Sequence, residues 1–227
     1  MSAPPAARRS SPGAPFTVAE LAARFGSLPA GRIHSSPAPG TATREDAEAA
    51  REAGFLCEWV ENTLIDKALS ELTSFVAARI IGLLNPLVHD GELGWVLAPD
   101  GFVDLYGGTL QRAPDVSVVL NEQRPNGLAG RGYSEGAPAL CVEVYSTSNT
   151  RPEMERKRTE YFENGCRLCW TVFPATDRRP ATVEVHTPES GPGDDAGTVL
   201  TDADELSAAP VLSDFAVPVA SLFRRGA

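Results

Sequence analysis

The chain has 227 residues, of which 42% are hydrophobic and 22% are charged, and its formal net charge is −10. These proportions are typical of globular proteins and disfavour collagen-like, wholly disordered and membrane-spanning classes. The excess of acidic over basic side chains also argues against a passive DNA-coating protein, because neutralising phosphates needs lysine and arginine in excess on the contacting face.

The chain shows no targeting or membrane segment. No run of about 18 apolar residues occurs, and the proline-rich and arginine-containing first fifteen residues lack the apolar stretch of a secretory signal. We therefore expect a cytoplasmic protein that does not enter a membrane. The four cysteines fit a reducing compartment and are predicted to form no disulfides.

Composition and capping signals divide the chain into an arm, a peripheral segment and a core. Residues 1–15 are predicted to be a disordered arm, and residues 16–54 to be peripheral helices with a Pro/Gly/Ser-rich connector. Thr17 with Glu20, and Thr43 with Asp46, have the spacing of helix starts, because the threonine side chain can cap a backbone N–H three residues later. A single core domain is predicted over residues 55–225.

Hydrophobic periodicity predicts strands and helices in a mixed order within this core. The region from Gly94 to Tyr145 is most simply interpreted as antiparallel ribbons. The expected strands cover residues 55–61, 63–65, 115–120, 139–145, 167–173 and 182–186, and the expected helices cover residues 68–84 and 150–165. A polar loop is expected over residues 191–197. This order predicts an α/β (α+β mixed sheet) architecture, with a mixed β-sheet flanked by helices.

One acidic residue lies in an otherwise apolar strand. Alternation places Cys141, Glu143 and Tyr145 on one face of that strand, opposite Leu140 and its apolar neighbours. Burying a lone carboxylate is costly, so Glu143 must meet a cation, a basic side chain or water in a cleft. A salt-bridged glutamate and a metal ligand are both consistent with this pattern.

Asp115 and Lys157 become candidate site residues when they are considered together with Glu143. Asp115 opens the neighbouring apolar strand after a proline, where an ordinary turn aspartate is the alternative. Lys157 lies on the following helix, where a solvated charge paired with Glu153 is the alternative. Two carboxylates at adjacent strand ends could bind a hard cation such as Mg²⁺, and a lysine folded back over the sheet could orient or activate water.

Together these segments resemble the Uma2 family of restriction-endonuclease-like proteins, within the PD-(D/E)XK nuclease superfamily. The resemblance covers residues 16 to 223 and is carried by the ordered segments Leu56-Cys57-Glu58, Arg112-Ala113-Pro114-Asp115, Leu140-Cys141-Val142-Glu143-Val144-Tyr145-Ser146, Ser148-Asn149-Thr150, Lys157, Tyr161, Gly165, Trp170 and Pro174. The superfamily lysine usually stands two residues after the acid, a position that Tyr145 occupies here.

The resemblance implies a restriction-endonuclease-like fold. It also implies hydrolysis of DNA with Mg²⁺ as the cofactor, or with Mn²⁺ as an alternative. Asp115 and Glu143 would be the metal ligands, Lys157 the catalytic lysine and Glu58 a third acid or a surface strand residue. A homodimer is expected if both strands of a duplex are cut. The competing hypothesis is a noncatalytic nuclease-fold interaction module that binds a protein or nucleic acid partner.

Other basic and cysteine side chains yield weaker hypotheses. Four arginines near the predicted site could either contact phosphate or be solvated helix charges: Arg151, Arg156, Arg158 and Arg167. Cys166 and Cys169 have C-x-x-C spacing, but without a second such pair, core packing is favoured over zinc.

Overall fold

A computed structural model describes residues 13–26, 28–130, 132–177, 179–190 and 197–224. Most of the predicted arm and of the predicted loop over residues 191–197 lies outside the described residues. The α-helices are α1 (Val18–Phe25), α2 (Arg44–Glu52), α3 (Glu71–Asn85) and α4 (Arg151–Glu163). The short helical turns are η1 (Ala30–Arg32), η2 (Pro86–Asp90), η3 (Asn121–Gln123), η4 (Pro188–Ser190) and η6 (Val219–Leu222).

The predicted helix starts are confirmed at atomic detail. Thr17, Thr43 and Thr150 each accept a hydrogen bond from the backbone N–H three residues later, and an acidic side chain returns the contact in every case. Such reciprocal caps satisfy backbone donors that the first helical turn leaves without partners. These starts are therefore determined by local sequence.

The strands form two larger sheets and a hairpin. They are β1 (Cys57–Val60), β2 (Thr63–Asp66), β3 (Gly94–Leu97), β4 (Val103–Leu105), β5 (Leu110–Arg112), β6 (Val116–Leu120), β7 (Ser134–Glu135), β8 (Leu140–Val144), β9 (Leu168–Phe173), β10 (Thr182–His186), β11 (Thr198–Thr201), β12 (Glu205–Ala208) and β13 (Leu212–Pro218). The larger sheet has the order β11-β10-β9-β8-β6-β3, the smaller has the order β2-β1-β5-β4-β7, and β12 pairs with β13.

The larger sheet is mixed, as predicted. Strands β3, β6 and β8 pair antiparallel, whereas β8 and β9 pair parallel in the register Glu143↔Thr171. Helix α4 provides the crossover between β8 and β9, since parallel strands need a long connection. The predicted α/β fold class is therefore confirmed, and α4 is held against the strand that carries Glu143.

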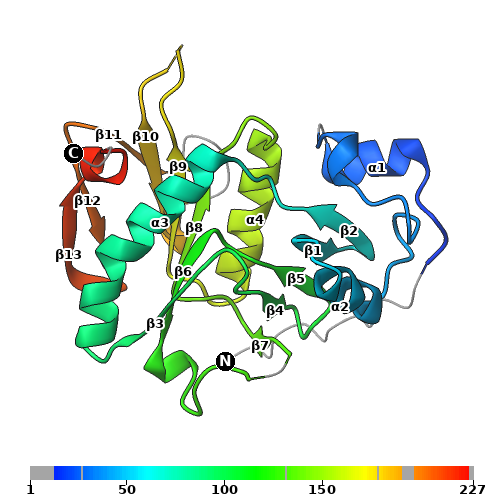
Figure 1. The fold of residues 1–227 in the computed structure, drawn as a ribbon, viewed down its shortest axis with the longest axis horizontal. Helices are drawn as coiled ribbons and strands as arrows, with labels where there is room; N and C mark the ends of the chain where they lie inside the picture. The colour runs from blue at the N-terminus through cyan, green and yellow to red at the C-terminus, as the bar shows by residue number, and fades with distance from the viewer. Residues whose placement is uncertain (1–12, 27, 131, 178, 191–196, 225–227) are drawn as a thin grey trace.

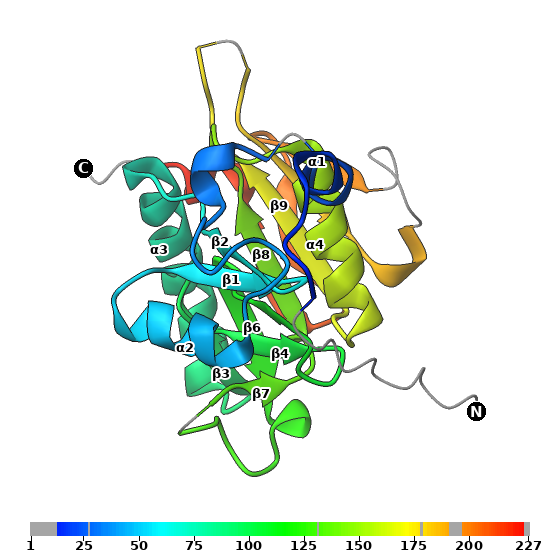
Figure 2. The ribbon, with the colours of Figure 1, turned by 90° about the vertical axis from the view of Figure 1, so that its right-hand side faces the viewer.

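The two long helices cover different faces of the larger sheet (Figures 1 and 2). Helix α3 and the β12–β13 hairpin lie on one face, and α4 lies on the other with the smaller sheet beside it. Helix α1 buries none of its residues, while α2 contributes Ala47 to a small cluster with Cys57 and Trp59. The segment before the core is thus peripheral at α1 and packed at α2.

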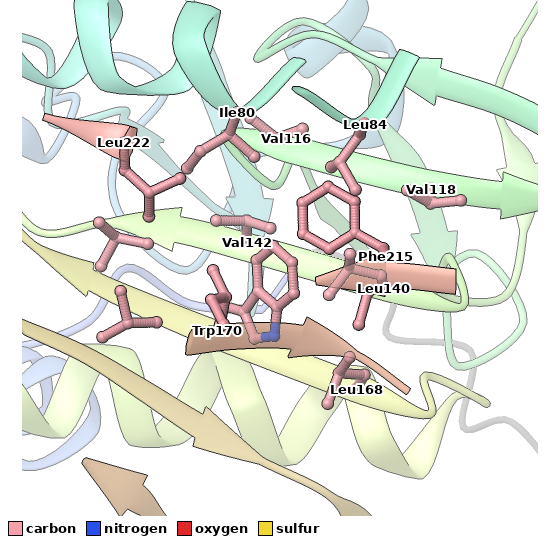
Figure 3. Close-up of a cluster of buried hydrophobic side chains, with 14 of the residues drawn as sticks. Ile80, Leu84, Val116, Val118, Leu140, Val142, Leu168, Trp170, Phe215 and Leu222 are labelled. Atoms are coloured by element: carbon pink, nitrogen blue, oxygen red, sulfur yellow. The ribbon is translucent and has the colours of Figure 1, made fainter. Parts of the chain in front are cut away.

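The main hydrophobic core lies between the larger sheet, α3 and the C-terminal hairpin. Figure 3 shows Ile80 and Leu84 of α3 facing Val142 and Trp170, with Phe215 of β13 closing the cluster. The alternation predicted for β8 is confirmed. Its even-numbered residues enter this core, whereas Cys141 joins a second cluster on the opposite face. Glu143 therefore points to the face covered by α4.

The helical stretch Glu71–Asp90 is long and apolar enough, by length and composition, to cross a membrane. Its residues Val76, Ile80 and Leu84 are buried in the main core, and 33% of its most apolar 18-residue window is buried, so core packing accounts for part of its hydrophobicity. This assignment agrees with the sequence prediction of a long amphipathic core helix.

Truncating Leu84 should be strongly destabilising. Leu84 is fully buried among core residues, so we expect Leu84→Ala to lower the free energy of unfolding by about 2–5 kcal/mol through lost burial and a residual cavity. Urea unfolding measures the change. Leu72→Ala on the same helix is the control, because Leu72 is 49% exposed and should cost much less; equal losses would contradict the core described here.

Candidate active site

Asp115 and Glu143 are held on neighbouring strands. Asp115 directly precedes β6, and its N–H donates to the Val142 carbonyl at 2.9 Å. Its side-chain Oδ2 accepts the Val144 N–H at 2.8 Å, which fixes the carboxylate beside the strand that carries Glu143. The two carboxylates are thus positioned by backbone hydrogen bonding of the sheet.

Lys157 joins the acids of two different sheets. Its Nζ lies 3.1 Å from Glu143 Oε2 and 3.1 Å from Glu58 Oε1. Lys157 is 2% exposed, so this contact is shielded from solvent. The alternative pairing with Glu153 does not occur, because Glu153 forms a bidentate ion pair with Arg32.

Glu58 is fully buried and is not a surface strand residue. Besides Lys157, it accepts hydrogen bonds from Arg112 Nη1 at 2.7 Å and from the Ala113 N–H at 3.3 Å. Arg112 in turn donates through Nε to Glu160 of α4 at 2.7 Å. Glu58 therefore anchors both Lys157 and the segment that leads into Asp115.

A second buried lysine contacts the site. Lys67 Nζ lies 3.0 Å from Asp115 Oδ1 and donates to the carbonyl oxygens of Ala113 at 2.6 Å and Pro99 at 3.0 Å. Lys67 was not predicted as a site residue, because nothing in its local sequence shows that it is buried against a residue 48 positions later. Only the packing of the two sheets brings it to Asp115.

Tyr161 completes the contacts of Glu143. Its hydroxyl donates to Glu143 Oε1 at 2.6 Å, so each carboxylate oxygen of Glu143 has a partner. Burial and the nearby Glu143 raise the pKa of Tyr161 well above its ordinary value, which keeps the hydroxyl protonated as a donor. Its position four residues after Lys157, on the same helical face, was a usable sequence signal.

The charges of the cluster are unevenly compensated. Burial raises the pKa of Glu143 to about 7, and the neighbouring Asp115 and Glu58 add to the rise against the lowering effect of Lys157. Burial also opposes ionisation of Glu58, but Lys157 and Arg112 outweigh it and hold the pKa of Glu58 well below its ordinary value. Glu58 is therefore the permanent counterion of Lys157, while Glu143 lacks sufficient positive charge nearby.

The donor chemistry fits a hard divalent cation at Asp115 and Glu143. Burial raises the pKa of Glu143 and the neighbouring Asp115 adds to the rise, so an added positive charge would favour the ionised carboxylate. Mg²⁺ is commonly bound by one or two carboxylates and several waters, so it does not need a third protein acid. Within the described ranges, no group of three or more His, Cys, Asp or Glu side chains is arranged to hold a metal.

The basic side chains near the cluster are engaged by protein partners. Arg151 pairs with Glu184, Arg156 pairs with Glu61 and Glu160, Arg158 contacts His186, and Arg167 pairs with Glu122. As these arginines already have polar partners, binding phosphate would compete with contacts that exist in the folded protein. Their proposed role as phosphate contacts is weakened accordingly.

The prediction that the two cysteines of the C-x-x-C spacing pack in the core is confirmed. Cys166 and Cys169 are free, buried and packed with Cys141 and Tyr161 in the cluster beneath α4. Burial raises the pKa of Cys169 well above its ordinary value, which favours the unreactive thiol.

The comparisons with known proteins agree with a nuclease fold. The described residues superimpose on the crystal structure of a putative nuclease belonging to DUF820 from Anabaena variabilis, with a TM-score of 0.61 and 17% identity. The match covers 74% of this chain and 89% of the other. At that identity, the likeness establishes the fold.

The sequence itself identifies the family. Residues 44–220 match the Uma2 family, which is described as "putative restriction endonuclease", and the chain belongs to this family. The resemblance predicted from the sequence is thus confirmed. No curated protein matches the chain.

The raised pKa of Glu143 predicts a specific pH dependence of stability. A carboxyl whose pKa rises from 4.5 to about 7 on folding binds its proton more tightly in the folded state. Its stabilising contribution is complete below pH 4.5 and is lost as the pH rises toward 7. The stabilising contribution of Glu58, whose pKa is lowered, is complete above its ordinary pKa of 4.5 and is lost only as the pH falls below that value, so it stays constant across this interval.

We therefore expect the metal-free wild type to lose more stability than Glu143→Gln as the pH rises from 4.5 to 7. Urea midpoints measured in chelator across this interval test the difference. Glu122→Gln, at a carboxylate 68% exposed, should follow the wild type. A wild type and a Glu143→Gln variant with parallel pH profiles would contradict the assigned environment of Glu143.

Proposed function

We propose that this chain is a cytoplasmic, Mg²⁺-dependent endonuclease that hydrolyses phosphodiester bonds of DNA. The observation that carries the proposal is the contact of Lys157 with both Glu58 and Glu143, beside Asp115 at the start of the neighbouring strand. Membership of a family of restriction-endonuclease-like proteins supports the same activity. Mg²⁺ is proposed from the two carboxylates, and Mn²⁺ is the alternative with similar ligand preferences.

Asp115 and Glu143 would hold the cation. When bound, Mg²⁺ would lower the pKa of a coordinated water and offset the charge of the scissile phosphate. Backbone donation from Val144 holds Asp115, and the Tyr161 hydroxyl holds Glu143, so both carboxylates are oriented before any substrate arrives. Such preorganisation reduces the rearrangement needed during the reaction.

Lys157 would orient the attacking water and offset charge that develops on the phosphate. Burial opposes its charge, but Glu143 and Glu58 outweigh this effect and raise the pKa of Lys157, so its ammonium group stays protonated. A protonated lysine acts as a hydrogen-bond donor and a fixed positive charge, not as a general base. Glu58 fixes the position of Lys157, and Arg112 in turn holds Glu58.

The alternative function is a noncatalytic interaction module with the same fold. The observation that favours it is that each candidate acid already has a basic partner: Glu58 and Glu143 contact Lys157, and Asp115 contacts Lys67. Buried acids can be retained for structural pairing alone, in which case removing one would destabilise the protein. Cation binding discriminates between the two functions.

Removing either proposed ligand should abolish both metal binding and cleavage. We expect Asp115→Asn and Glu143→Gln to lose the heat of Mg²⁺ binding and to cut DNA at least about 10²–10³-fold more slowly, since each loses a charge aimed at the reacting phosphate. Titration calorimetry and a cleavage assay on single- and double-stranded DNA measure the two effects on folded protein.

Glu122→Gln removes one acidic charge at an exposed position and should retain binding and cleavage. Metal binding that persists in the ligand variants would exclude these residues as ligands. If the wild type binds no cation and cuts no DNA, the interaction module becomes the better assignment.

Removal of Lys67 should separate stability from cation affinity. Lys67→Met leaves Asp115 without its ion-pair partner and two carbonyl oxygens without a donor, so the metal-free protein should lose stability. It also removes a positive charge that competes for Asp115, so Mg²⁺ should bind more tightly, as measured by calorimetry. Weaker Mg²⁺ binding in a folded Lys67→Met protein would show that Lys67 positions the ligand instead of competing for it.

A further inference from the structure

A cavity of about 630 Å³ opens beside the candidate site, and Asp115 forms part of its wall. We call it the base cavity. Most of its wall comes from the start of α3 with the two residues before it and from the turn after β3. Leu56 before β1 and Asp115 before β6 complete the wall. Its size falls within the range of pockets that hold small molecules, about 300–1,000 Å³.

The depth of the site restricts what can reach it. Glu58, Glu143 and Lys157 are 0%, 5% and 2% exposed, and Asp115, on the cavity wall, is 8% exposed. Of these four side chains only Asp115 lines the cavity, so a nucleic acid that enters the cavity meets the candidate site at Asp115. An intact duplex keeps its bases paired inside the helix, whereas a single strand can insert a base at low cost.

The cavity wall suits a base better than a phosphate. Leu56, Leu69 and Pro99 offer apolar surface, on which the flat face of a base can pack. Glu71 and Asp100 are both exposed on this cavity, where their charges repel phosphate. Carboxylates instead accept hydrogen bonds from exocyclic amines, which cytosine, adenine and guanine carry and thymine lacks.

The charge distribution points the same way. The net charge is −10, and no lysine or arginine is among the described residues that line the cavity. Affinity based on neutralising many phosphates, as duplex-binding proteins achieve it, is therefore weak on this face. Contacts to an unstacked base would supply the affinity that the backbone contacts do not.

We infer that the base cavity receives an unstacked base of a single DNA strand, one that carries an exocyclic amine as cytosine does, and so places the adjoining phosphate at Asp115. The inference rests on the proposed function, because it names the substrate of that same site. It also removes the need for a homodimer, since one site suffices to cut one strand.

Binding of short fluorescent oligonucleotides in chelator, measured by anisotropy, tests the cavity without cleavage. The wild type should bind a cytosine-containing single strand more tightly than the same strand with an abasic position, with thymine, or in a duplex. Ser74→Trp fills the cavity from an exposed position on α3 and should weaken binding of the cytosine strand about tenfold or more.

Leu72→Trp is the matched control. Leu72 lies on the same helix and is 49% exposed, but it lines a different cavity with Phe75 and Phe223, so this variant should bind like the wild type. Circular dichroism verifies that both variants fold. Binding of the cytosine strand that is unaffected by Ser74→Trp, or equal for cytosine, abasic and duplex probes, would overturn the base cavity.

A parallel cleavage assay with Mg²⁺ keeps the two proposals separable. Cytosine-dependent binding without cleavage of any DNA would refute the nuclease function and leave the base cavity standing. If duplex and single strands are cleaved at equal rates, and Ser74→Trp slows the cleavage of neither, the nuclease function is supported and the base cavity is refuted.

Discussion

The fold around the candidate site depends on one constraint: a buried carboxylate must have a cation beside it. Glu58 in the smaller sheet and Glu143 in the larger sheet are both inaccessible to solvent, and Lys157 of α4 lies 3.1 Å from each. Neither acid could be buried alone at tolerable cost. The lysine therefore joins two sheets and a helix that share little sequence proximity, and the relative position of these elements follows from that contact.

The remaining polar contacts extend this arrangement. Arg112 connects Glu58 to Glu160 and so ties the segment before Asp115 to α4. Lys67 ties Asp115 to the carbonyl oxygen of Pro99, at the wall of the base cavity. The carboxylate of Asp115 itself is held by the Val144 N–H at Oδ2 and by Lys67 at Oδ1. Its orientation is therefore set before any ligand arrives.

Sequence patterns predicted the parts of this structure that are determined locally. The helix starts at Thr17, Thr43 and Thr150 and the alternation of β8 follow from residues within one turn or one strand, and they agree with the structure. The contacts of Lys67 could not be predicted, because its burial depends on residues far along the chain. The arginines of α4 show the same limit. A pattern reveals that they are basic but not that Glu61, Glu184 and His186 already engage them.

The uneven compensation of the acids has a consequence for how the site balances stability and chemistry. Glu58 contacts both Lys157 and Arg112 and is stable as an anion. Burial raises the pKa of Glu143 to about 7, because Lys157 is its only ion-pair partner among the described residues and Asp115 adds to the rise. Adding a basic residue beside Glu143 would stabilise the metal-free protein but would also occupy the space and charge that a cation needs. The incomplete compensation of Glu143 is therefore a cost to the fold, and under the proposed function a gain in cation affinity would offset that cost.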